Sequence, residues 1–184
     1  MKQILTAFLI MSIFASCDNK KNEQTDDNAT AATATTKDST ETKPVEFADA
    51  RYADVGKHFI DAFSKGDIDG WMTDWADNGV FVWNSGDSVA GKTAIGNYWK
   101  DRWTSLDSIT FTNAIWLPIT VNKPQSVEAP GTWLLGWYMF NEKFKNGKRV
   151  VQWAHDDLHF NDAGKVDRMI HYVDMAPIKA ALGK

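Results

Sequence analysis

The stretch that decides the fold is TWLLGWYMFNEKFKNGKRVVQWAHDDLHF, residues 132–160. The dipeptide Asn146-Gly147 divides it into two runs rich in aromatic and β-branched side chains. Asn-Gly between two such runs is a strong signal for a β-hairpin, because both residues accept the positive φ of a tight turn. A further turn after Phe160 leads into a third run, residues 166–175. The sequence therefore predicts three consecutive antiparallel strands.

The two turns predict which side chains share a face of this sheet. A two-residue loop at Asn146-Gly147 places Tyr138 opposite His155, and a four-residue second loop places Asp157 opposite Arg168. Because side chains alternate along a strand, the first face carries Tyr138, Phe140, Trp153, His155, Asp157, Arg168, Tyr172 and Asp174. The opposite face carries Trp133, Leu135, Trp137, Met139, Ala154, Asp156, Leu158, Met169 and His171. A slip of one residue in either turn would exchange these assignments.

The segments before the hairpin predict helices. Apolar side chains recur at helical spacing in three segments, residues 48–64, 67–75 and 92–103. Residues 80–83 and 108–121 indicate strands, and Pro118 within the longer one predicts an edge or a bulge. The tail 178–182 fits a helical turn. Helices first and a long antiparallel sheet afterwards predict an α+β fold, with the helices on one face of a curved sheet.

Three motifs resemble a known family. They are Phe63-Ser64-Lys65-Gly66-Asp67, the segment 89–95 (VAGKTAI), and the segment 160–166 (FNDAGKV) followed by Tyr172-Val173-Asp174. Together they resemble the nuclear transport factor 2-like cone fold and, within it, the SnoaL-like group. The resemblance implies an α+β cone over residues 47–184, with three N-terminal helices packed on a strongly curved, mainly antiparallel sheet. Proteins with that fold include isomerases, cyclases, dehydratases and plain binders. The resemblance therefore implies the fold more specifically than the function.

The first 17 residues predict export and lipidation. Lys2, an apolar run over residues 4–14 and the small residues Ala15-Ser16 have the layout of a secretory signal peptide, residues 1–16. The apolar run is shorter than the roughly 20 residues that span a membrane. Phe14-Ala15-Ser16-Cys17 resembles the lipobox of bacterial lipoproteins, which implies that Cys17 carries lipid and begins the mature chain. The alternative is an ordinary signal peptide with an incidental cysteine, which could form no internal disulfide because Cys17 is the only cysteine.

The composition divides the rest of the chain at Phe47. Residues 17–46 contain no aromatic residue, so we expect the lipidated Cys17 to be followed by a disordered tether. All nine Trp and all four Tyr lie further on, in one predicted domain, residues 47–184. The net charge of −4 and the lack of a Lys/Arg cluster argue against a nucleic-acid partner. We expect a cell-envelope protein anchored to a membrane through Cys17, with the outer membrane favoured and the leaflet open.

The first predicted face mixes ionisable groups with aromatic rings, which is typical of a pocket. The resemblance places a functional Asp at Asp174, which we therefore expect to be a general base. His155 would be a proton donor or carbonyl polariser, and Tyr172 a hydrogen-bond donor. The residues expected to shape an apolar pocket are Trp83, Trp99, Tyr138, Phe140 and Trp153.

Several alternatives stay open for these residues. Asp157 and Arg168 could form a cross-strand ion pair, His155 could be structural, and Asp174 could anchor the last turn. Asp156 and His171, on the opposite face, are a second candidate acid/base pair. We expect no metal and no cofactor, because alternation separates Asp156 from Asp157 and the sequence has no Cys/His metal spacing.

Three functions agree with this sequence. The favoured one is a lipid-anchored binder of a small apolar or aromatic molecule. The second is a SnoaL-like acid/base enzyme of isomerase, cyclase or dehydratase type, using Asp174 and His155. The third is an interaction module that uses a Trp-rich sheet face, for example as a homodimer.

Overall fold

The computed structural model describes residues 42–124 and 129–184. The predicted signal peptide, the lipidated Cys17 and most of the predicted tether lie outside the described residues. Residues 40–184 form one compact unit that contains the whole sheet and core, so we expect this unit to fold by itself. No helix within the described ranges is long and apolar enough to cross a membrane.

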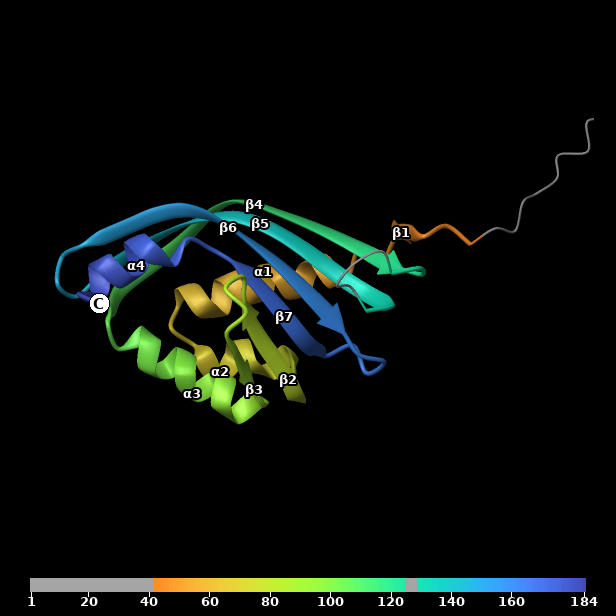
Figure 1. Cartoon of the computed structure of the whole chain (residues 1–184), viewed down its shortest axis with the longest axis horizontal. Coiled ribbons are helices and arrows are strands. Elements are labelled where there is room, and N and C mark those ends of the chain that lie inside the picture. The colour runs from red at the N-terminus through yellow and green to blue at the C-terminus, as the bar shows by residue number, and fades with distance from the viewer. Residues whose placement is uncertain (1–41, 125–128) are drawn as a thin grey trace, which may run out of the picture. The chain divides into compact units, whose positions relative to one another are not determined.

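A curved seven-stranded sheet is the main element of the domain (Figure 1). Its order is β1-β4-β5-β6-β7-β2-β3, and every neighbouring pair is antiparallel except β2 and β7, which run parallel. The strands are β1 Val45–Phe47, β2 Trp75–Trp83, β3 Ser88–Ala90, β4 Leu106–Val121, β5 Gly131–Phe144, β6 Arg149–Phe160 and β7 Val166–Tyr172. The sheet is therefore mixed, with one parallel pair in an otherwise antiparallel arrangement.

The described residues contain four α-helices, so the expected three are one too few. They are α1 Tyr52–Ser64, α2 Ile68–Trp71, α3 Lys92–Trp103 and α4 Met175–Leu182, with a 3-10 turn at Met72–Asp74. The extra helix is α4, which replaces the single helical turn expected near the C-terminus. Figure 1 shows the sheet arching over α1, with α3 on the same side. The α+β prediction is confirmed.

Local chemistry explains the first two helices. Phe59, Ala62 and Phe63 recur at helical spacing on α1, and this face is buried. Gly66 follows the helix with φ of 72°, a left-handed conformation that suits glycine at a helix end. Asp67 then begins α2, because its Oδ1 accepts a hydrogen bond from the backbone N–H of Gly70 at 2.8 Å.

The predicted register of the β5–β6 hairpin is wrong by one residue. Tyr138 lies opposite Ala154, not opposite His155. The backbone N–H of Phe144 donates to the carbonyl of Lys148 at 2.9 Å, which leaves a three-residue loop in place of the predicted two. Gly147 closes this loop with φ of 86°, as the left-handed glycine of a three-residue hairpin does.

The second turn also departs from its predicted register. Asn161 N–H donates to the carbonyl of Lys165 at 2.9 Å, and the register shifts between His159 and Phe160, where Asp167 of β7 is the extra residue of a bulge. As a result Asp156 lies opposite His171, and Asp157 opposite Ile170 rather than Arg168. The predicted Asp157–Arg168 pairing is therefore wrong.

The first slip, of one residue, exchanges the faces of β6 and β7 relative to β5, whereas the second moves β7 by two residues along β6 and keeps its faces. The concave face, which covers the helices, now collects Tyr138, Phe140, Ala154, Asp156, Met169 and His171. The outer face carries Trp137, Trp153, His155, Asp157 and Tyr172. The alternating pattern was recognised correctly, but the pairing of the strands was not.

The domain begins earlier than Phe47. Val45 and Glu46, assigned to the tether, lie in β1 and pair with Val121 and Thr120 of β4. The carbonyl of Pro44 also accepts the backbone N–H of Asn122 at 2.8 Å. This short strand covers one end of β4, whose backbone would otherwise be an open sheet edge. The remainder of β4, with Pro118, has no strand on that side within the described residues, as expected for a proline in a sheet.

Trp116 of β4 fits only because two glycines face it. A methyl group on Gly136 of β5 would lie 2.2 Å from Trp116 Cζ3, and one on Gly56 of α1 would lie 2.5 Å from Trp116 Cδ2. Both distances are far below van der Waals contact. The indole therefore occupies the space that the missing side chains leave between α1 and the sheet.

We predict that Gly136→Ala lowers the free energy of unfolding of the 40–184 domain by about 1–3 kcal/mol, because Trp116 must move. Gly96→Ala is the matched control. Gly96 is also buried, but its nearest neighbour, Met72 Cγ, lies 3.4 Å from the added carbon, so the better helix propensity of Ala should raise stability by up to about 1 kcal/mol. Urea denaturation measures both. Equal effects of the two substitutions would contradict the packing of Trp116.

Candidate functional site

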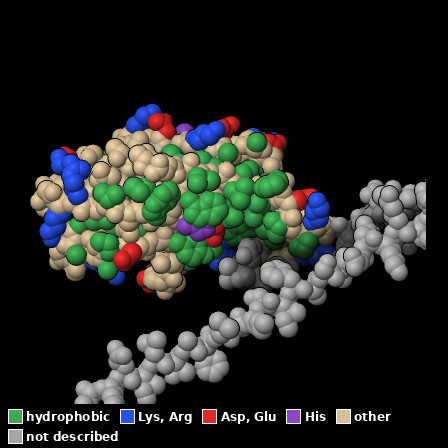
Figure 2. Space-filling view, turned by 90° about the horizontal axis from the view of Figure 1, so that it is seen from above, with side chains coloured by type: hydrophobic (Ala, Val, Ile, Leu, Met, Phe, Trp, Pro, Cys, Tyr) green, Lys and Arg blue, Asp and Glu red, His purple; other side chains and the backbone are tan. Residues whose placement is uncertain are grey.

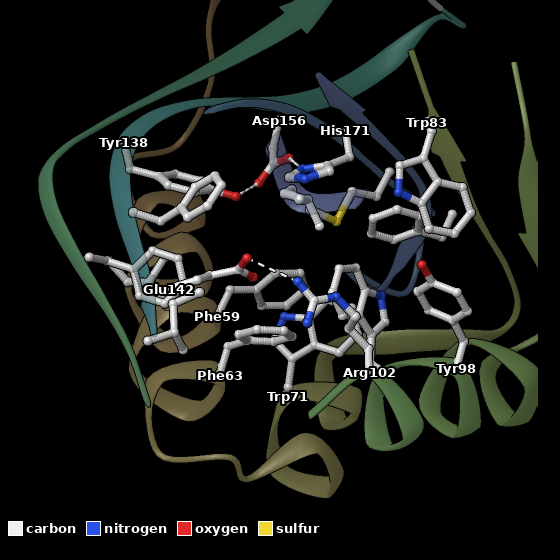
Figure 3. Close-up of a pocket in the computed structure, with 18 of the residues that line it drawn as sticks. Phe59, Phe63, Trp71, Trp83, Tyr98, Arg102, Tyr138, Glu142, Asp156 and His171 are labelled. Atoms are coloured by element: carbon white, nitrogen blue, oxygen red, sulfur yellow. Dashed lines mark hydrogen bonds and ion pairs between the residues drawn. The ribbon is translucent and has the colours of Figure 1, made fainter. Parts of the chain in front are cut away.

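A cavity of about 70 Å³ lies between the concave face of the sheet and the helices (Figure 3). At roughly 10–15 Å³ per water, it has space for about five waters or for one ring of an organic molecule. It is lined by Phe59, Ile60, Phe63, Trp71, Phe81, Trp83, Tyr98, Trp99, Arg102, Ile109, Phe111, Trp116, Tyr138, Phe140, Glu142, Asp156, Met169, His171, Met175 and Ile178. Most of these side chains are aromatic or aliphatic, with a few polar groups among them, as in small-molecule sites.

A buried carboxylate joins three strands on the sheet side of the cavity. Asp156 of β6 is only 2% exposed, and its Oδ1 lies 2.6 Å from Nδ1 of His171 on β7. The hydroxyl of Tyr138 on β5 donates to its other oxygen, Oδ2. Figure 3 shows the three side chains in a row along one wall. Burial raises the pKa of Tyr138 well above its usual value, and the charge of Asp156 adds to this, so the phenol stays a proton donor.

This arrangement orients the imidazole of His171. The carboxylate of Asp156 takes the proton-bearing Nδ1, which leaves Nε2 as the basic nitrogen. Within the described residues no hydrogen bond to Nε2 is found, and the ring borders the cavity. An imidazole held in this way by a carboxylate can accept a proton at Nε2 and be stabilised as an imidazolium.

An ion pair occupies the opposite part of the cavity. Arg102 Nη2 of α3 lies 2.9 Å from Glu142 Oε2 of β5, and both side chains are almost fully buried. Arg102 Nη1 also donates to Ser105 Oγ at 2.9 Å. Burial raises the pKa of Glu142, and the nearby charge of Arg102 only partly opposes this effect.

Four of the five predicted pocket residues line the cavity. They are Trp83, Trp99, Tyr138 and Phe140, contributed by β2, α3 and β5. Trp153 does not: it lies on the outer face of the sheet and is 50% exposed. The one-residue slip of the hairpin accounts for this difference, because it turns the odd-numbered residues of β6 away from the helices.

His155 and Tyr172 also lie on the outer face, away from the cavity. His155 Nε2 lies 2.8 Å from Asp157 Oδ1, and its ring stacks on Trp137 with centroids 4.6 Å apart. Burial lowers the pKa of His155, but the hydrogen bond and charge of Asp157, with smaller contributions from Gly136 and Asp156, outweigh burial and leave it raised. Figure 2 looks onto this face and shows a broad band of apolar side chains with few charges inside it.

Asp174 lies at the start of α4, outside the cavity. Its Oδ1 accepts a hydrogen bond from the backbone N–H of Ala176 at 2.9 Å, so it is the N-cap of that helix. It borders only a shallow depression near Asn84 and Ser85. The structure thus does not bring Asp174, His155 and Tyr172 together with the pocket residues. The alternative pair, Asp156 and His171, is the one that meets in the cavity.

Sequence reasoning missed Arg102 and Glu142. A signal for Glu142 was present, because it alternates with Tyr138, Phe140 and Phe144, the buried set of β5. Arg102 follows Trp99 at a spacing of three, which places both on one side of α3. Neither pattern shows that the two residues meet, because they are 40 positions apart in the sequence. No group of three or more metal-ligating side chains occurs within residues 42–124 and 129–184.

Comparisons with known proteins agree with this fold. The family model described as the SnoaL-like domain matches residues 57–169. A Bacillus subtilis protein provisionally named an isomerase has a TM-score of 0.57 and 19% identity, covering 71% of this chain and 91% of its own. A Xanthomonas campestris protein provisionally named a polyketide cyclase has a TM-score of 0.58 and 16% identity, covering 72% and 96%. No curated protein matches this chain.

A third similar structure comes from Burkholderia pseudomallei and is described as a nuclear transport factor 2-like protein of unknown function. Its TM-score is 0.57 at 12% identity, over 74% of this chain and 100% of its own. At these identities the likeness shows the fold alone. It supports a nuclear transport factor 2-like α+β fold with a curved mixed sheet and four helices, and it leaves the chemistry to the residues of this chain.

We predict that Asp157→Asn destabilises the 40–184 domain more at about pH 5.5 than at about pH 8.5. The raised pKa of His155 means that the folded chain holds its proton more tightly than an unfolded chain, whose His pKa is 6.5. This stabilisation is complete below pH 6.5 and is lost as the pH rises through the folded value. Thermal unfolding at both pH values measures it, with Asp162→Asn in the exposed turn as control. A pH-independent effect of Asp157→Asn would refute the assignment.

Proposed function

Because this chain belongs to the SnoaL-like domain family, we propose that its cavity catalyses acid/base chemistry on a small, largely apolar molecule. One observation carries the proposal: the His171 imidazole borders an aromatic cavity while the buried carboxylate of Asp156 holds its Nδ1. In this proposal Asp156 and His171 take the catalytic roles that the sequence suggested for Asp174 and His155. Relatedness to proteins named as polyketide cyclases and isomerases agrees with either catalysis or binding.

Each residue has a defined role in the proposed reaction. His171 Nε2 removes a proton from a carbon of the bound molecule, and the two electrons of that C–H bond remain in the substrate. Asp156 stabilises the imidazolium that forms, and the Tyr138 hydroxyl holds its other oxygen in place. His171 then returns the proton to another atom, so that a double bond shifts or a new bond closes without any net gain or loss. The apolar walls exclude water, which strengthens these electrostatic interactions.

We predict that the 40–184 domain accelerates the ring opening of 5-nitrobenzisoxazole, a small aromatic probe. A base removes one carbon-bound proton, the N–O bond breaks, and a coloured cyanophenolate forms, so the reaction reports a base in an apolar cavity. His171→Asn should lower kcat/KM at least about 100-fold, because a positioned general base contributes about 10²–10⁴. His58→Asn is the control, since His58 is exposed on α1 and pairs with Asp74.

The two functions have different outcomes in this assay. If the unchanged domain binds the probe saturably but does not accelerate its ring opening, the enzymatic function is excluded. The domain would then be a binder of small apolar or aromatic molecules. That second candidate is favoured by the hydrogen bonds that already occupy both oxygens of Asp156. Full activity in His171→Asn would also exclude His171 as the base.

The apolar outer face supports a further role in association. Ile115, Val151, Trp153 and Tyr172 are exposed there among other apolar side chains, and exposed patches of this kind mark contact surfaces. A second copy of the chain is the partner we propose for this face. Analytical ultracentrifugation of the domain reports it directly, and a monomer at high micromolar concentration would exclude it.

We propose that the chain is anchored in the cell envelope through lipid on Cys17, with the outer membrane favoured. Two or more acyl chains hold a protein stably on a membrane, at about 0.8 kcal/mol per buried CH₂. We therefore expect the full-length protein to incorporate labelled palmitate and to sediment with membranes, and Cys17→Ser to lose both properties. The control is Ser12→Ala, which leaves the cysteine in place. Unchanged labelling of Cys17→Ser would exclude lipidation at this residue.

A further inference from the structure

The lining of the cavity contains two carboxylates but only one permanent cation. Its ionisable lining consists of the carboxylates of Asp156 and Glu142, the guanidinium of Arg102, the imidazole of His171 and two tyrosines. In the state in which His171 acts as a base its imidazole is neutral, so one of the two carboxylates is then left without a balancing cation. An anionic ligand would add to this excess, whereas a cationic ligand would cancel it. Charge alone therefore favours a positively charged ligand in this cavity.

Glu142 is the carboxylate with capacity left for a ligand. Both oxygens of Asp156 accept hydrogen bonds, but Glu142 accepts one only at Oε2 within the described residues, from Arg102 Nη2 at 2.9 Å. Within the described residues no hydrogen bond to Oε1 is found, although the residue is only 5% exposed. Figure 3 shows its carboxylate directed into the cavity. Glu142 lines the cavity, so a ligand N–H there could donate to this oxygen.

Arg102 does not cancel this preference. Its Nη2 and Nη1 donate to Glu142 and Ser105, and its guanidinium lies over the ring of Phe144, 5.0 Å from the centroid. Phe144 is buried but does not line the cavity. The positive charge of Arg102 is therefore directed to partners in the protein. Burial still raises the pKa of Glu142 in spite of this neighbour, which agrees with a carboxylate that is incompletely stabilised.

The rings around the cavity suit a cation as well as an apolar molecule. Phe59, Phe63, Trp71, Phe81 and Trp99 form one continuous aromatic cluster, with centroid distances between 5.1 and 6.1 Å for neighbouring pairs. An aromatic face attracts an organic ammonium group within about 6 Å, by about 2 kcal/mol when the site is dry. A neutral molecule of the same shape gains only the burial of its surface.

We propose that the ligand of this cavity is a small organic amine in its protonated form. Its N–H donates to Glu142 Oε1, and its carbon substituents lie among the aromatic rings. This inference rests on the proposed function in one respect, since both assign the ligand to the same cavity. It adds the charge of the ligand, which the acid/base proposal leaves open.

Three benzyl compounds of equal size and different charge test this inference on the 40–184 domain. They are protonated N,N-dimethylbenzylamine, the neutral isobutylbenzene and the anionic phenylacetate, which differ only in the three heavy atoms attached to the benzyl group. Tryptophan fluorescence follows binding, because several indoles line the cavity. We expect the ammonium compound to bind on the order of tenfold more tightly than isobutylbenzene, and phenylacetate to bind most weakly.

A substitution at Glu142 makes the assignment specific. Glu142→Gln removes the carboxylate charge but keeps an oxygen for Arg102, so the preference for the ammonium compound should disappear and phenylacetate should gain affinity. Glu46→Gln is the matched control, because Glu46 is exposed on β1 and bonds Asn122 at the edge of the sheet. Circular dichroism of both variants verifies that they are folded. The comparison of the three compounds on the unchanged domain stands even if Glu142→Gln does not fold.

The outcomes separate this inference from the proposed function. Tighter binding of isobutylbenzene or phenylacetate, or no saturable binding of the ammonium compound, would overturn the amine assignment. The effect of His171→Asn on the nitrobenzisoxazole reaction would be untouched by any of these results, because that probe is neutral. Conversely, an ammonium preference that Glu142→Gln abolishes would stand even in a domain without turnover.

Discussion

The three-residue loop at 145–147 determines which side chains of β6 face the cavity. Because side chains alternate with a period of two, one added loop residue moves the whole of β6 from one face to the other relative to β5. The loop is closed by a left-handed glycine, and the bulge before Phe160 then sets the register of β7. Asp156, His171 and Tyr138 meet in the cavity because both of these local features are present.

The buried polar network and the aromatic core depend on each other. Asp156 can remain buried because Tyr138 and His171 satisfy both of its oxygens, and the surrounding rings exclude the water that would otherwise compete. The hydrogen-bond donors of the aromatic core are less completely paired. Within the described residues no hydrogen-bond partner is found for the indole N–H groups of Trp75, Trp99, Trp103 and Trp116. Trp99 lies edge-to-face with Phe63 and Tyr98, at 84° and 89°, an arrangement that suits weak N–H contacts with ring faces.

Pairing of histidine with aspartate does not distinguish the candidate base in this protein. Each of the four histidines lies within 2.8 Å of an Asp oxygen: His58 with Asp74, His155 with Asp157, His159 with Asp167 and His171 with Asp156. What separates them is location. His171 borders the cavity, whereas His155 lies on the outer face among exposed aromatic side chains. The surroundings of the pair, rather than the pair itself, therefore single out His171 as the candidate base.

The sequence by itself determined the features that depend on neighbours along the chain. Helical spacing located α1 and α3, Asn-Gly located the hairpin, and composition separated the aromatic domain from the residues before it. Alternation also identified the correct sets of side chains on each strand. Only the tertiary structure decided which sets face each other, because a loop one residue longer leaves the local pattern unchanged. The Arg102–Glu142 pair likewise could not be predicted, since its contact depends on how α3 packs against β5, and this packing is an outcome of the whole core.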